Sequence, residues 1–552
     1  MEKRVLLAIV LSFLVLVLYQ ALFVKKPPPP EISPEKIQEF EKKPKQEISP
    51  KIQPPPSPTP LEQVRQEEEK ILKPISEEVE EQILIDTSLY QAVWSNKGAV
   101  LKSWKLKKYK DEIKEDLELV SLHSGEINKY PFSLNTDDPS FDDSINRALY
   151  SFSNLKLELK RGQMGKLRFE YADEKGNRVE KIFIFQDGKY SFDVQVNVWK
   201  NAQKIEPLLL WGPSLGNPSP TEQKMRFGGG RGVAIYAAQK VHRQDERKFK
   251  PEQNIFNFVI WAAYENNYFT ALFLTSPQQS SAIFLREVKD QSPYFFLALS
   301  YPQRAYLGPK EIDALSEFGN DAKKLIKFGF FGLMAQILLK AIKSVHSIIP
   351  NWGFSIIILT FIIKIIFFPL TYKSTRSMAK MQELQPKIKA LRAKYKKAKR
   401  DIAQRRKMNE EMMKLYKEQG INPAGGCLPM LVQIPIFLGF FRLLAISIEF
   451  RQSPFILWIK DLSVKDPYYI TPILMGITQF ISQKMTPTSA DPTQQKMMLI
   501  MPVVMTVIFL NFQSGLILYW LTNNVLQIGQ QYIMNRLMQK KKRETHGKRR
   551  KK

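Results

Sequence analysis

The sequence predicts an α-helical polytopic membrane protein with six transmembrane helices, a large all-β domain outside the membrane and a helical hairpin in the cytoplasm. Three observations predict this fold class. Six apolar blocks are long enough to cross a bilayer. Between the first two blocks, short runs of alternating apolar and polar residues are typical of antiparallel strands. Lysine and arginine gather in alternate loops between the later blocks, as the positive-inside rule requires.

The composition favours a membrane protein that is not an enzyme. The 552 residues carry a formal charge of +28, and the 44% that are hydrophobic occur in long blocks, so the charge belongs to basic surfaces beside a membrane. The single cysteine, Cys427, has no partner for an intramolecular disulfide and no nearby His to activate it. The sequence has no cluster of metal ligands and no Ser/His/Asp spacing, so we expect no catalytic residue, metal or cofactor.

The amino-terminal segment, residues 1–26, is predicted to be a transmembrane anchor. Val5–Val24 is apolar over the length of a bilayer-crossing helix. A cleaved signal peptide is the alternative, but the apolar run continues into KKPPPP rather than a small-x-small cleavage site, which favours an uncleaved anchor. Residues 27–82 are rich in Pro, Glu and Lys with almost no aromatic residues, so we expect a disordered tether.

Residues 83–318 are predicted to form one large β-sandwich domain. Runs such as KLRFEYAD, KIFIFQDGKYSFDVQVNVW and AIFLREV alternate apolar with polar residues and are separated by DG, GN and NP turns. The stretch FGGGRGV, Phe227–Val233, is glycine-rich like a phosphate-binding loop. It lacks the Lys-Ser/Thr ending of such loops, so we interpret it as a flexible loop.

Residues 319–349 are predicted to contain an amphipathic helix in the membrane interface. Lys323–Ser347 has apolar residues at helical spacing and lysines on the other side. Residues 350–535 then form a core of five spans. The predicted spans are Trp352–Leu370, Leu428–Ile448, Tyr468–Gln483, Met497–Asn511 and Leu516–Ile533.

The charges of the short loops set the orientation of these spans. The loop from Thr371 to Gly426 has 16 Lys and Arg against 5 Asp and Glu, whereas residues 448–467 have 3 of each. The tail, residues 536–552, has 10 basic residues against 1 acidic residue. The basic loops face the cytoplasm, so both termini are predicted to be cytoplasmic and the β domain to lie outside the membrane.

The basic segment 371–426 is predicted to be a cytoplasmic hairpin of two antiparallel helices joined near Lys399–Ile402. Its apolar side chains recur every three or four residues, which is a helical period. They are Met378, Met381, Leu384, Ile388, Leu391 and Tyr395, and then Ile402, Met408, Met412, Leu415 and Tyr416. The long Met and Lys side chains suit contacts with many partners; a basic hairpin that only touches anionic lipid heads is the alternative.

Several blocks of the sequence, in order, closely resemble the YidC membrane protein insertase family. They are NWGFSIIILTFIIKIIFFPLTYKSTRSMAKMQELQPKI, NPAGGCLPMLVQIPIFLGFF, SPFILWIKDLSVKDPYYITPILMG, QKMTPTSADPTQQKMMLIMPVVMTVIFL and SGLILYWLTNN. The resemblance covers about Phe328 to Lys541, and the layout of the remainder is similar to the Gram-negative form of the family. It implies a five-helix insertase core with a groove open to the cytoplasm and the lipid, and a periplasmic β-supersandwich domain in the bacterial inner membrane.

The candidate site is the polar interior of the helical core. Lys364 puts a positive charge within the first core span, where an unpaired charge costs at least about 2.5 kcal/mol unless it snorkels to the interface or faces water. The resemblance implies that this position belongs to a hydrophilic groove, in which the family has arginine, and that Tyr519 and Trp520 contact substrate. We expect the substrate groove to be formed by Lys364, Thr360, Gln433, Tyr519, Trp520 and Asn523.

Other readings of the same residues remain open at this stage. Lys364 could snorkel past Pro369, and each polar residue could only bond a neighbouring helix. Arg442 lies near the outer end of its span, so outward snorkelling is favoured over a place in the groove. The resemblance implies a non-enzymatic insertase and chaperone acting alone or with the Sec translocon. Its expected partners are nascent membrane proteins, the Sec translocon, the ribosome through the basic hairpin and tail, and membrane lipids, but not DNA.

Two alternative functions come from other classes of protein. The first is a secondary transporter or channel that uses the intramembrane Lys364 as a solute site; the halves of the chain show no inverted repeat and few intramembrane acids, which argues against it. The second is a membrane-anchored carbohydrate-binding protein whose activity lies in the β domain.

Overall fold

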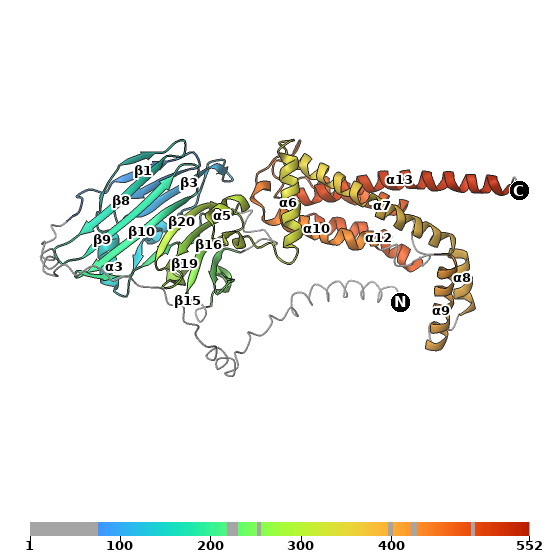
Figure 1. Ribbon diagram of the computed structural model, residues 1–552, viewed down its shortest axis with the longest axis horizontal. Coiled ribbons are helices and arrows are strands. Elements are labelled where there is room, and N and C mark those ends of the chain that lie inside the picture. Colours follow the sequence, from blue (N-terminus) through green and yellow to red (C-terminus); the bar gives the residue numbers. More distant parts are fainter. Residues whose placement is uncertain are drawn as a thin grey trace, which may run out of the picture. The chain divides into compact units, whose positions relative to one another are not determined.

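The computed structural model describes residues 75–217, 230–250, 255–395, 401–420, 428–486 and 492–550 (Figure 1). The predicted amino-terminal anchor, nearly all of the tether and Cys427 lie outside these residues. The described chain consists of a β domain, from Gln82 to Phe318, followed by a helical region.

The β domain is built from strands whose side chains alternate between buried and accessible, as in the pattern of β9 (Arg178–Gln186). The other strands are β1 (Gln82–Asp86), β2 (Tyr90–Ser95), β3 (Val100–Lys110), β4 (Asp116–Glu118), β5 (Leu134–Asn135), β6 (Ser151–Phe152), β7 (Lys156–Glu158), β8 (Met164–Ala172), β10 (Ser191–Lys200), β11 (Gln203–Ile205), β12 (Leu208–Trp211), β13 (Gly232–Ala237), β14 (Lys240–Asp245), β15 (Ile255–Asn257), β16 (Val259–Glu265), β17 (Phe269–Thr275), β18 (Ser281–Lys289), β19 (Ser292–Leu299) and β20 (Pro302–Pro309). Its short helices are α2 (His123–Ile127), α3 (Pro139–Arg147), η2 (Glu246–Lys248) and α5 (Ile312–Phe318).

These strands form a ten-stranded central sheet and two five-stranded sheets. The central order is β14-β13-β16-β17-β20-β10-β9-β8-β6, with β11 paired to β10; the others are β4-β3-β2-β1-β7 and β15-β18-β19-β12-β5. Almost all pairs are antiparallel, and β1 with β7 is a parallel pair. Consecutive strands thus mostly lie side by side, as the closely spaced turn signals in the sequence predict.

Both five-stranded sheets pack on the same face of the central sheet. Phe185, Phe192, Ala305 and Phe273 are directly opposite one another across β9, β10, β20 and β17, so they share one face. Trp94 of β2 packs against Phe183 and Phe185, with its ring centroid 4.2 Å from that of Phe183, and Trp211 of β12 packs 5.9 Å from Phe273. The domain is therefore a two-layer sandwich with an aromatic core.

A lysine lies inside this core. Lys181 of β9 is fully buried on the same face as Phe183 and donates hydrogen bonds to the carbonyl oxygens of Gly98, Ala99 and Phe132 at 2.7, 3.1 and 2.8 Å. These three acceptors match the three N–H groups of an ammonium. Burial lowers the pKa of Lys181 to about 7, because the interior disfavours the charged form. Lys181 thus joins two loops, one at Gly98–Ala99 and one at Phe132, to the central sheet.

Among the residues that the structure describes, the helical region has eight α-helices and two short 3-10 turns. The helices are α6 (Gly332–His346), α7 (Trp352–Glu383), α8 (Gln385–Lys394), α9 (Ile402–Glu418), α10 (Leu428–Ile446), α11 (Ile470–Met485), α12 (Pro492–Phe509) and α13 (Ser514–Arg550); the turns are η4 (Ala322–Leu325), before α6, and η7 (Ile448–Phe450), after α10. Side-chain caps fix two of the starts: Asn351 accepts from the Phe354 N–H at α7, and Asp401 from the Ala403 N–H at α9.

The first core helix is longer than the sequence predicts. The expected span ends at Leu370, just after Pro369, but α7 continues through that proline to Glu383. A proline removes one backbone donor. The Thr371 hydroxyl donates to the carbonyls of Phe367 and Phe368, one turn before it in the helix. The helix continues past Pro369, and Met378 and Met381, which were expected in the hairpin, belong to α7.

The hairpin differs from prediction in the same region. One continuous helix was expected through Met378–Tyr395, but a break at Leu384 separates α7 from α8, because Pro386 has no N–H to continue the ladder and stands in the first turn of α8. Leu384 and Ile388 pack against Met381, Met412, Leu415 and Tyr416, and the Lys394 ammonium lies 2.9 Å from the Glu411 carboxylate. Helices α8 and α9 thus lie side by side.

The amphipathic helix before the core is shorter than expected. It begins at Gly332 rather than near Lys323, because Gly329 takes a positive φ of 74° and interrupts the backbone before it. Ala335, Leu338, Leu339 and Ile342 are buried against the rest of the protein. Leu333 and Ile337 lie 76% and 55% exposed on another face. The helix thus has a packed apolar face and a second apolar face left uncovered.

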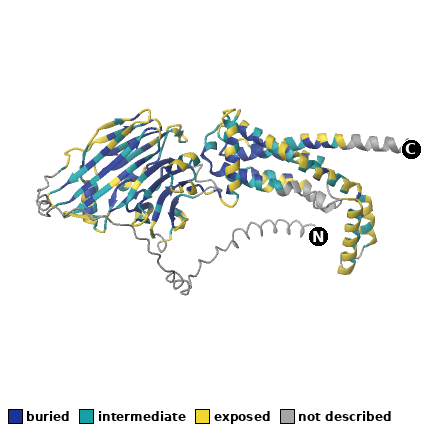
Figure 2. Cartoon of the chain, viewed as in Figure 1, coloured by how far each residue is buried: buried dark blue, intermediate teal, exposed yellow. Residues whose placement is uncertain are grey.

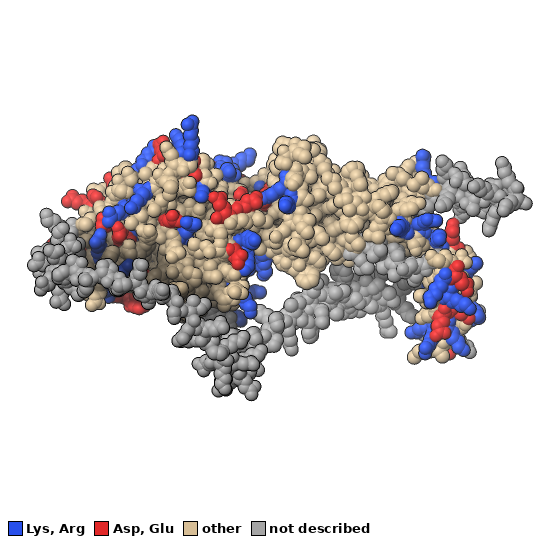
Figure 3. Space-filling model, in the orientation of Figure 1, with Lys and Arg blue, Asp and Glu red and all other residues tan. Residues whose placement is uncertain are grey.

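Outside the α8–α9 hairpin, much of the surface of the helical region is apolar. Helices α7, α11 and α12 leave many isoleucines, valines and phenylalanines exposed (Figure 2). In Figure 3, the visible face of these core helices is nearly free of charged side chains. The α8–α9 hairpin, in contrast, is covered with charged side chains. Within the described residues, α7 is the one helix long and apolar enough to cross a membrane; Val432–Ile446 and Leu499–Phe509 are shorter apolar helices. The predicted count of six spans stays a prediction.

Candidate functional site

A cavity of about 290 Å³ lies among α7, α10, α11 and α13. Helix α7 forms one wall through Ile363, Lys364, Phe367, Leu370, Thr371, Ser374, Thr375 and Met378, which recur every three or four residues along one helical face. The residues of this wall lie on both sides of Pro369. They form a single surface because α7 continues through that proline. The wall lies in the half of α7 that leads to the α8–α9 hairpin.

Helix α13 forms the opposite wall with an equally regular spacing. Tyr519, Trp520, Asn523, Asn524 and Gln527 line the cavity, one turn after another. The Lys364 ammonium donates to the Gln527 side-chain oxygen at 2.8 Å. This bond crosses the cavity and holds the charge of α7 against an amide of α13.

A second set of hydrogen bonds joins cavity residues of α10 and α11 to α13. Gln433 of α10 donates to the Tyr519 hydroxyl, and the Trp520 indole N–H donates to the Gln479 side-chain oxygen of α11 at 3.0 Å. The Tyr519 ring is 1% exposed and stacks on Phe440, and Trp520 packs against Phe437. Two helices, α10 and α11, are thereby tied to α13 around its two aromatic side chains.

The electrostatic character of the cavity comes from one charge among neutral polar groups. Of the described residues that line it, Lys364 is the one with a full charge, and none is an acid. Amides and hydroxyls supply the other polar atoms, from Thr371, Ser482, Thr486 and Asn523 among others. A site of this kind attracts an anionic or hydrogen-bonding group that cannot be accommodated in lipid.

Five of the six residues expected at the groove line this cavity: Lys364, Gln433, Tyr519, Trp520 and Asn523. Thr360 does not. Its side chain is 1% exposed and donates to the Ile356 carbonyl one turn back along α7, so its hydroxyl serves the helix rather than the cavity. Arg442 lies elsewhere too, donating to the Lys327 carbonyl in the segment before α6.

Sequence reasoning missed several cavity residues. Gln527 and Gln479 are not among the residues predicted for the groove, although the spacing of Gln527 from Trp520 and Asn523 along one helix face signals a shared surface. Ser374 and Thr375 were missed because the first span was expected to end at Leu370. The Lys364–Gln527 pair depends on how α7 packs against α13, which no local pattern shows.

We expect Tyr519→Phe to weaken the link between α10 and α13 while leaving the stacking on Phe440 in place. The change removes the hydroxyl that accepts from Gln433 and leaves that amide without this partner, a loss of about 1 kcal/mol. The thermal midpoint of the purified chain should fall by a few degrees. Gln433→Leu should give a similar loss, and the double variant should lose less than the sum of the two; strict additivity would contradict the coupling.

Comparisons with known proteins match the chain along nearly its whole length. The family described as "60Kd inner membrane protein" matches residues 344–542, and "YidC periplasmic domain" matches residues 82–341. A protein named "Membrane protein insertase YidC" from Syntrophus aciditrophicus is 38% identical over 559 residues, covering 97% of this chain and 100% of that protein. The protein of the same name from Geobacter sulfurreducens is 36% identical, covering 97% and 98% of the two chains.

A solved structure titled "Active YidC insertase crystal structure with the first transmembrane domain resolved" is 20% identical to this chain. The alignment covers 82% of this chain and 93% of that one with a TM-score of 0.35, which is too low for a comparison of the two folds.

Proposed function

Because the chain belongs to the YidC family of non-enzymatic membrane protein insertases, inner-membrane proteins with a periplasmic domain, we propose that the cavity around Lys364 is the groove that holds the polar segment of a substrate. The substrates of an insertase are nascent membrane proteins. The observation that carries the proposal is the single positive charge, held by Gln527 in a cavity otherwise lined by neutral groups.

The proposed role of the groove is to lower the cost of moving polar groups through the membrane. A charged side chain at the bilayer centre costs at least about 2.5 kcal/mol. A substrate carboxylate beside Lys364 has its charge compensated, and amides such as Asn523 and Gln433 replace part of its hydration. The apolar part of the substrate then enters lipid along the exposed isoleucines and valines of the core helices. Hydrophobic partitioning drives release, aided by the membrane potential at about 2.3 kcal/mol per charge per 100 mV.

The remaining parts of the chain have proposed roles in receiving the substrate. The α8–α9 hairpin and the end of α13 carry many lysines and arginines, which suit a ribosome or anionic lipid heads on the cytoplasmic side. This orientation places both termini in the cytoplasm and assumes six spans, five of them in the core. We include the Sec translocon as a partner on the resemblance of the chain to its family.

A crosslinking experiment tests the groove. A photoreactive residue at Ile363 or Asn523, both of which line the cavity, should crosslink to the polar segment of a ribosome-stalled membrane protein. The same probe at Ile477 is the control, because that side chain is 51% exposed on α11 and does not line the cavity. Equal crosslinking of the polar segment at all three positions would show that the cavity has no special role. Solute flux through proteoliposomes without insertion would instead favour the transporter.

A further inference from the structure

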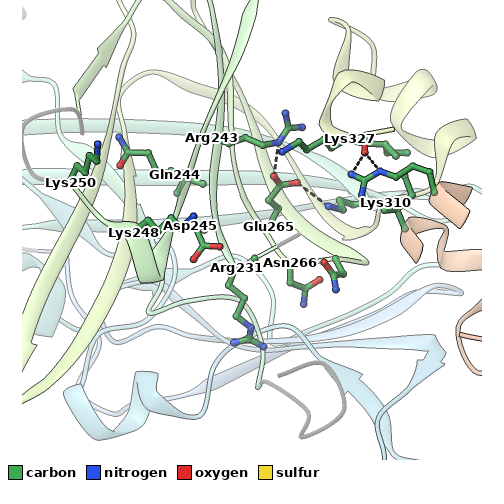
Figure 4. Close-up of a pocket in the computed structure, with 17 residues that line it drawn as sticks. Arg231, Arg243, Gln244, Asp245, Lys248, Lys250, Glu265, Asn266, Lys310 and Lys327 are labelled. Carbon is green, nitrogen blue, oxygen red and sulfur yellow. Dashed lines mark hydrogen bonds and ion pairs between the residues drawn. The ribbon is translucent and has the colours of Figure 1, made fainter. Parts of the chain in front are cut away.

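A second, strongly basic pocket lies at the end of the β domain that precedes the helical region. It has a volume of about 390 Å³ and includes Arg231, Arg243, Lys248, Lys250 and Lys310 of the β domain (Figure 4). Lys327 and Arg442 complete its cationic lining from the segment before α6 and from α10. The pocket shares no residue with the groove around Lys364.

The two carboxylates in the pocket leave most of this charge uncompensated. Glu265 is held between Arg243 and Lys310, at 3.0 and 2.9 Å, and Figure 4 shows its carboxylate pointing between them. Asp245 is paired with Arg247 at 2.9 Å. Seven cations against two carboxylates give a local excess of five positive charges. Such a concentration of one sign in a concave site attracts an anion.

Arg231 lines the pocket, but its guanidinium points away from Lys248 and Glu265 (Figure 4). Its Nη1 atom donates to the Ser214 hydroxyl at 3.3 Å and to the Gly216 carbonyl, so the guanidinium is held in place. Its Nη2 atom is buried and has no hydrogen-bond partner among the residues that the structure describes. The Arg231 guanidinium therefore adds positive charge beside the pocket, whereas the exposed lysines at the rim are the groups that a ligand can reach.

The glycines beside Arg231 explain why the strand comes so close to its neighbour. A Cβ atom on Gly232 would lie 1.9 Å from the Gln244 carbonyl oxygen, so a larger residue would push β13 away from β14. Arg231 and Gly232 are the end of the FGGGRGV stretch. Close backbone packing, rather than flexibility, accounts for the glycine at position 232.

Exposed apolar side chains of α6 and of the segment before it lie close to the pocket in the sequence. Lys327 lies three residues before Phe330, whose side chain is 96% exposed, and the exposed Leu333 and Ile337 follow on α6. In an inner-membrane protein, uncovered aromatic and aliphatic side chains on an amphipathic helix enter the membrane interface. The cations of the pocket therefore lie beside the lipid headgroups of the leaflet that faces the periplasmic domain.

We propose that this basic pocket binds the phosphate group of an anionic phospholipid headgroup and so anchors the β domain on the membrane surface. Lys248, Lys250 and Lys327 supply exposed ammonium groups at the rim, and the partly buried Arg243 and Lys310 add positive charge that Glu265 compensates only in part. Phosphate is the chemistry that these groups recognise, and the exposed apolar face of α6 selects a lipid as its source.

Native mass spectrometry of the full-length chain in detergent tests the proposal, with dioctanoyl phosphatidylglycerol, dioctanoyl phosphatidylcholine, inorganic phosphate and a glutamate-rich peptide as probes. Lys248→Glu with Lys250→Glu reverses two exposed charges and should weaken phosphatidylglycerol binding by about tenfold or more, since each basic residue near an anionic headgroup contributes about 1 kcal/mol. Lys166→Glu with Lys175→Glu is the matched control, because both lysines are exposed on the β domain and outside the pocket. Arg231→Lys keeps the charge and should weaken binding less than the rim reversal does.

Each outcome decides the proposal. Selective loss of phosphatidylglycerol binding in the rim variant, with competition by millimolar phosphate, supports it. Equal losses in the rim and control variants, or no loss in either, would overturn it. Phosphate binding without any preference for phosphatidylglycerol over phosphatidylcholine would assign the pocket to a free phosphate. Binding of a glutamate-rich peptide in place of the lipid would assign it to an acidic polypeptide. These results are independent of insertion, so they do not depend on the role of Lys364.

Discussion

Replacing Lys364 with alanine should reduce insertion of substrates with acidic translocated segments by about tenfold or more in reconstituted proteoliposomes. The ammonium is the one full charge in the cavity lining, and its loss leaves a substrate carboxylate facing only amides and hydroxyls. At an effective dielectric constant near 20, a charge pair 4 Å apart is worth about 4 kcal/mol, so even a fraction of that interaction accounts for a tenfold effect. Insertion is measured by protease protection of the translocated segment.

Two matched controls separate charge from structure. Lys364→Arg keeps the positive charge and should insert the same substrates at nearly the original rate, and Lys340→Ala, on the exposed side of α6, should have no effect. A substrate whose acidic residues are replaced by their amides should be insensitive to Lys364→Ala. Full insertion of the acidic substrate by Lys364→Ala would contradict the proposed groove charge.

The largest effect on stability is expected for Lys181→Met. The change keeps the length of the side chain but leaves the carbonyls of Gly98, Ala99 and Phe132 without the donor that satisfies them in the core. Each unsatisfied buried acceptor costs about 1 kcal/mol or more, so the β domain should lose about 3 kcal/mol, a large share of the stability of an ordinary domain. Urea unfolding of the intact chain, followed by the fluorescence of the buried Trp94 and Trp104, measures the loss.

The pH dependence of this variant gives an independent check. The pKa of Lys181 is about 7 in the folded protein and returns to its ordinary value of 10.5 on unfolding. Between these values the unfolded chain binds more protons, so the lysine makes stability rise with pH, by up to about 1.4 kcal/mol per pH unit. The gap between the original chain and Lys181→Met should therefore widen from pH 7 to pH 9. Lys166→Met, on the exposed side of β8, should show neither the loss nor the slope; a gap that narrows with pH would contradict the assignment.

Local sequence patterns were sufficient to predict a strand or helix where one of its faces is buried and the other is exposed to water or lipid. Period-two alternation locates strands such as β9 because inward side chains are buried and outward ones are not. Apolar runs locate helices α10 and α11 within two residues of their observed bounds. Proline was a weaker guide to helix ends: Pro369 lies inside α7, whereas Pro386 stands in the first turn of α8, just after a break.

The residues of the candidate site also divide into those that the sequence predicts correctly and one that it does not. Lys364, Gln433, Tyr519, Trp520 and Asn523 could be predicted because polar and aromatic residues in apolar spans, together with family resemblance, mark them out. Thr360 was predicted for its nearness to Lys364 in sequence, but residues four apart on a helix can face different neighbours once the helices pack, and its hydroxyl bonds its own helix.

By itself, the sequence determined the family, the division into a β domain and a helical core, and Lys364 as the residue that carries the intramembrane charge. Each of these follows from composition, from the strand or helix period of apolar residues, or from short blocks of residues. The tertiary structure alone decided that Lys364 meets Gln527, that Lys181 is enclosed by three carbonyls, and that Arg231, Lys310 and Arg442 share one basic pocket. These groups are far apart along the chain. Burial and hydrogen-bond geometry depend on which surfaces pack together, and hydrophobic packing fixes that choice only when the whole chain has folded.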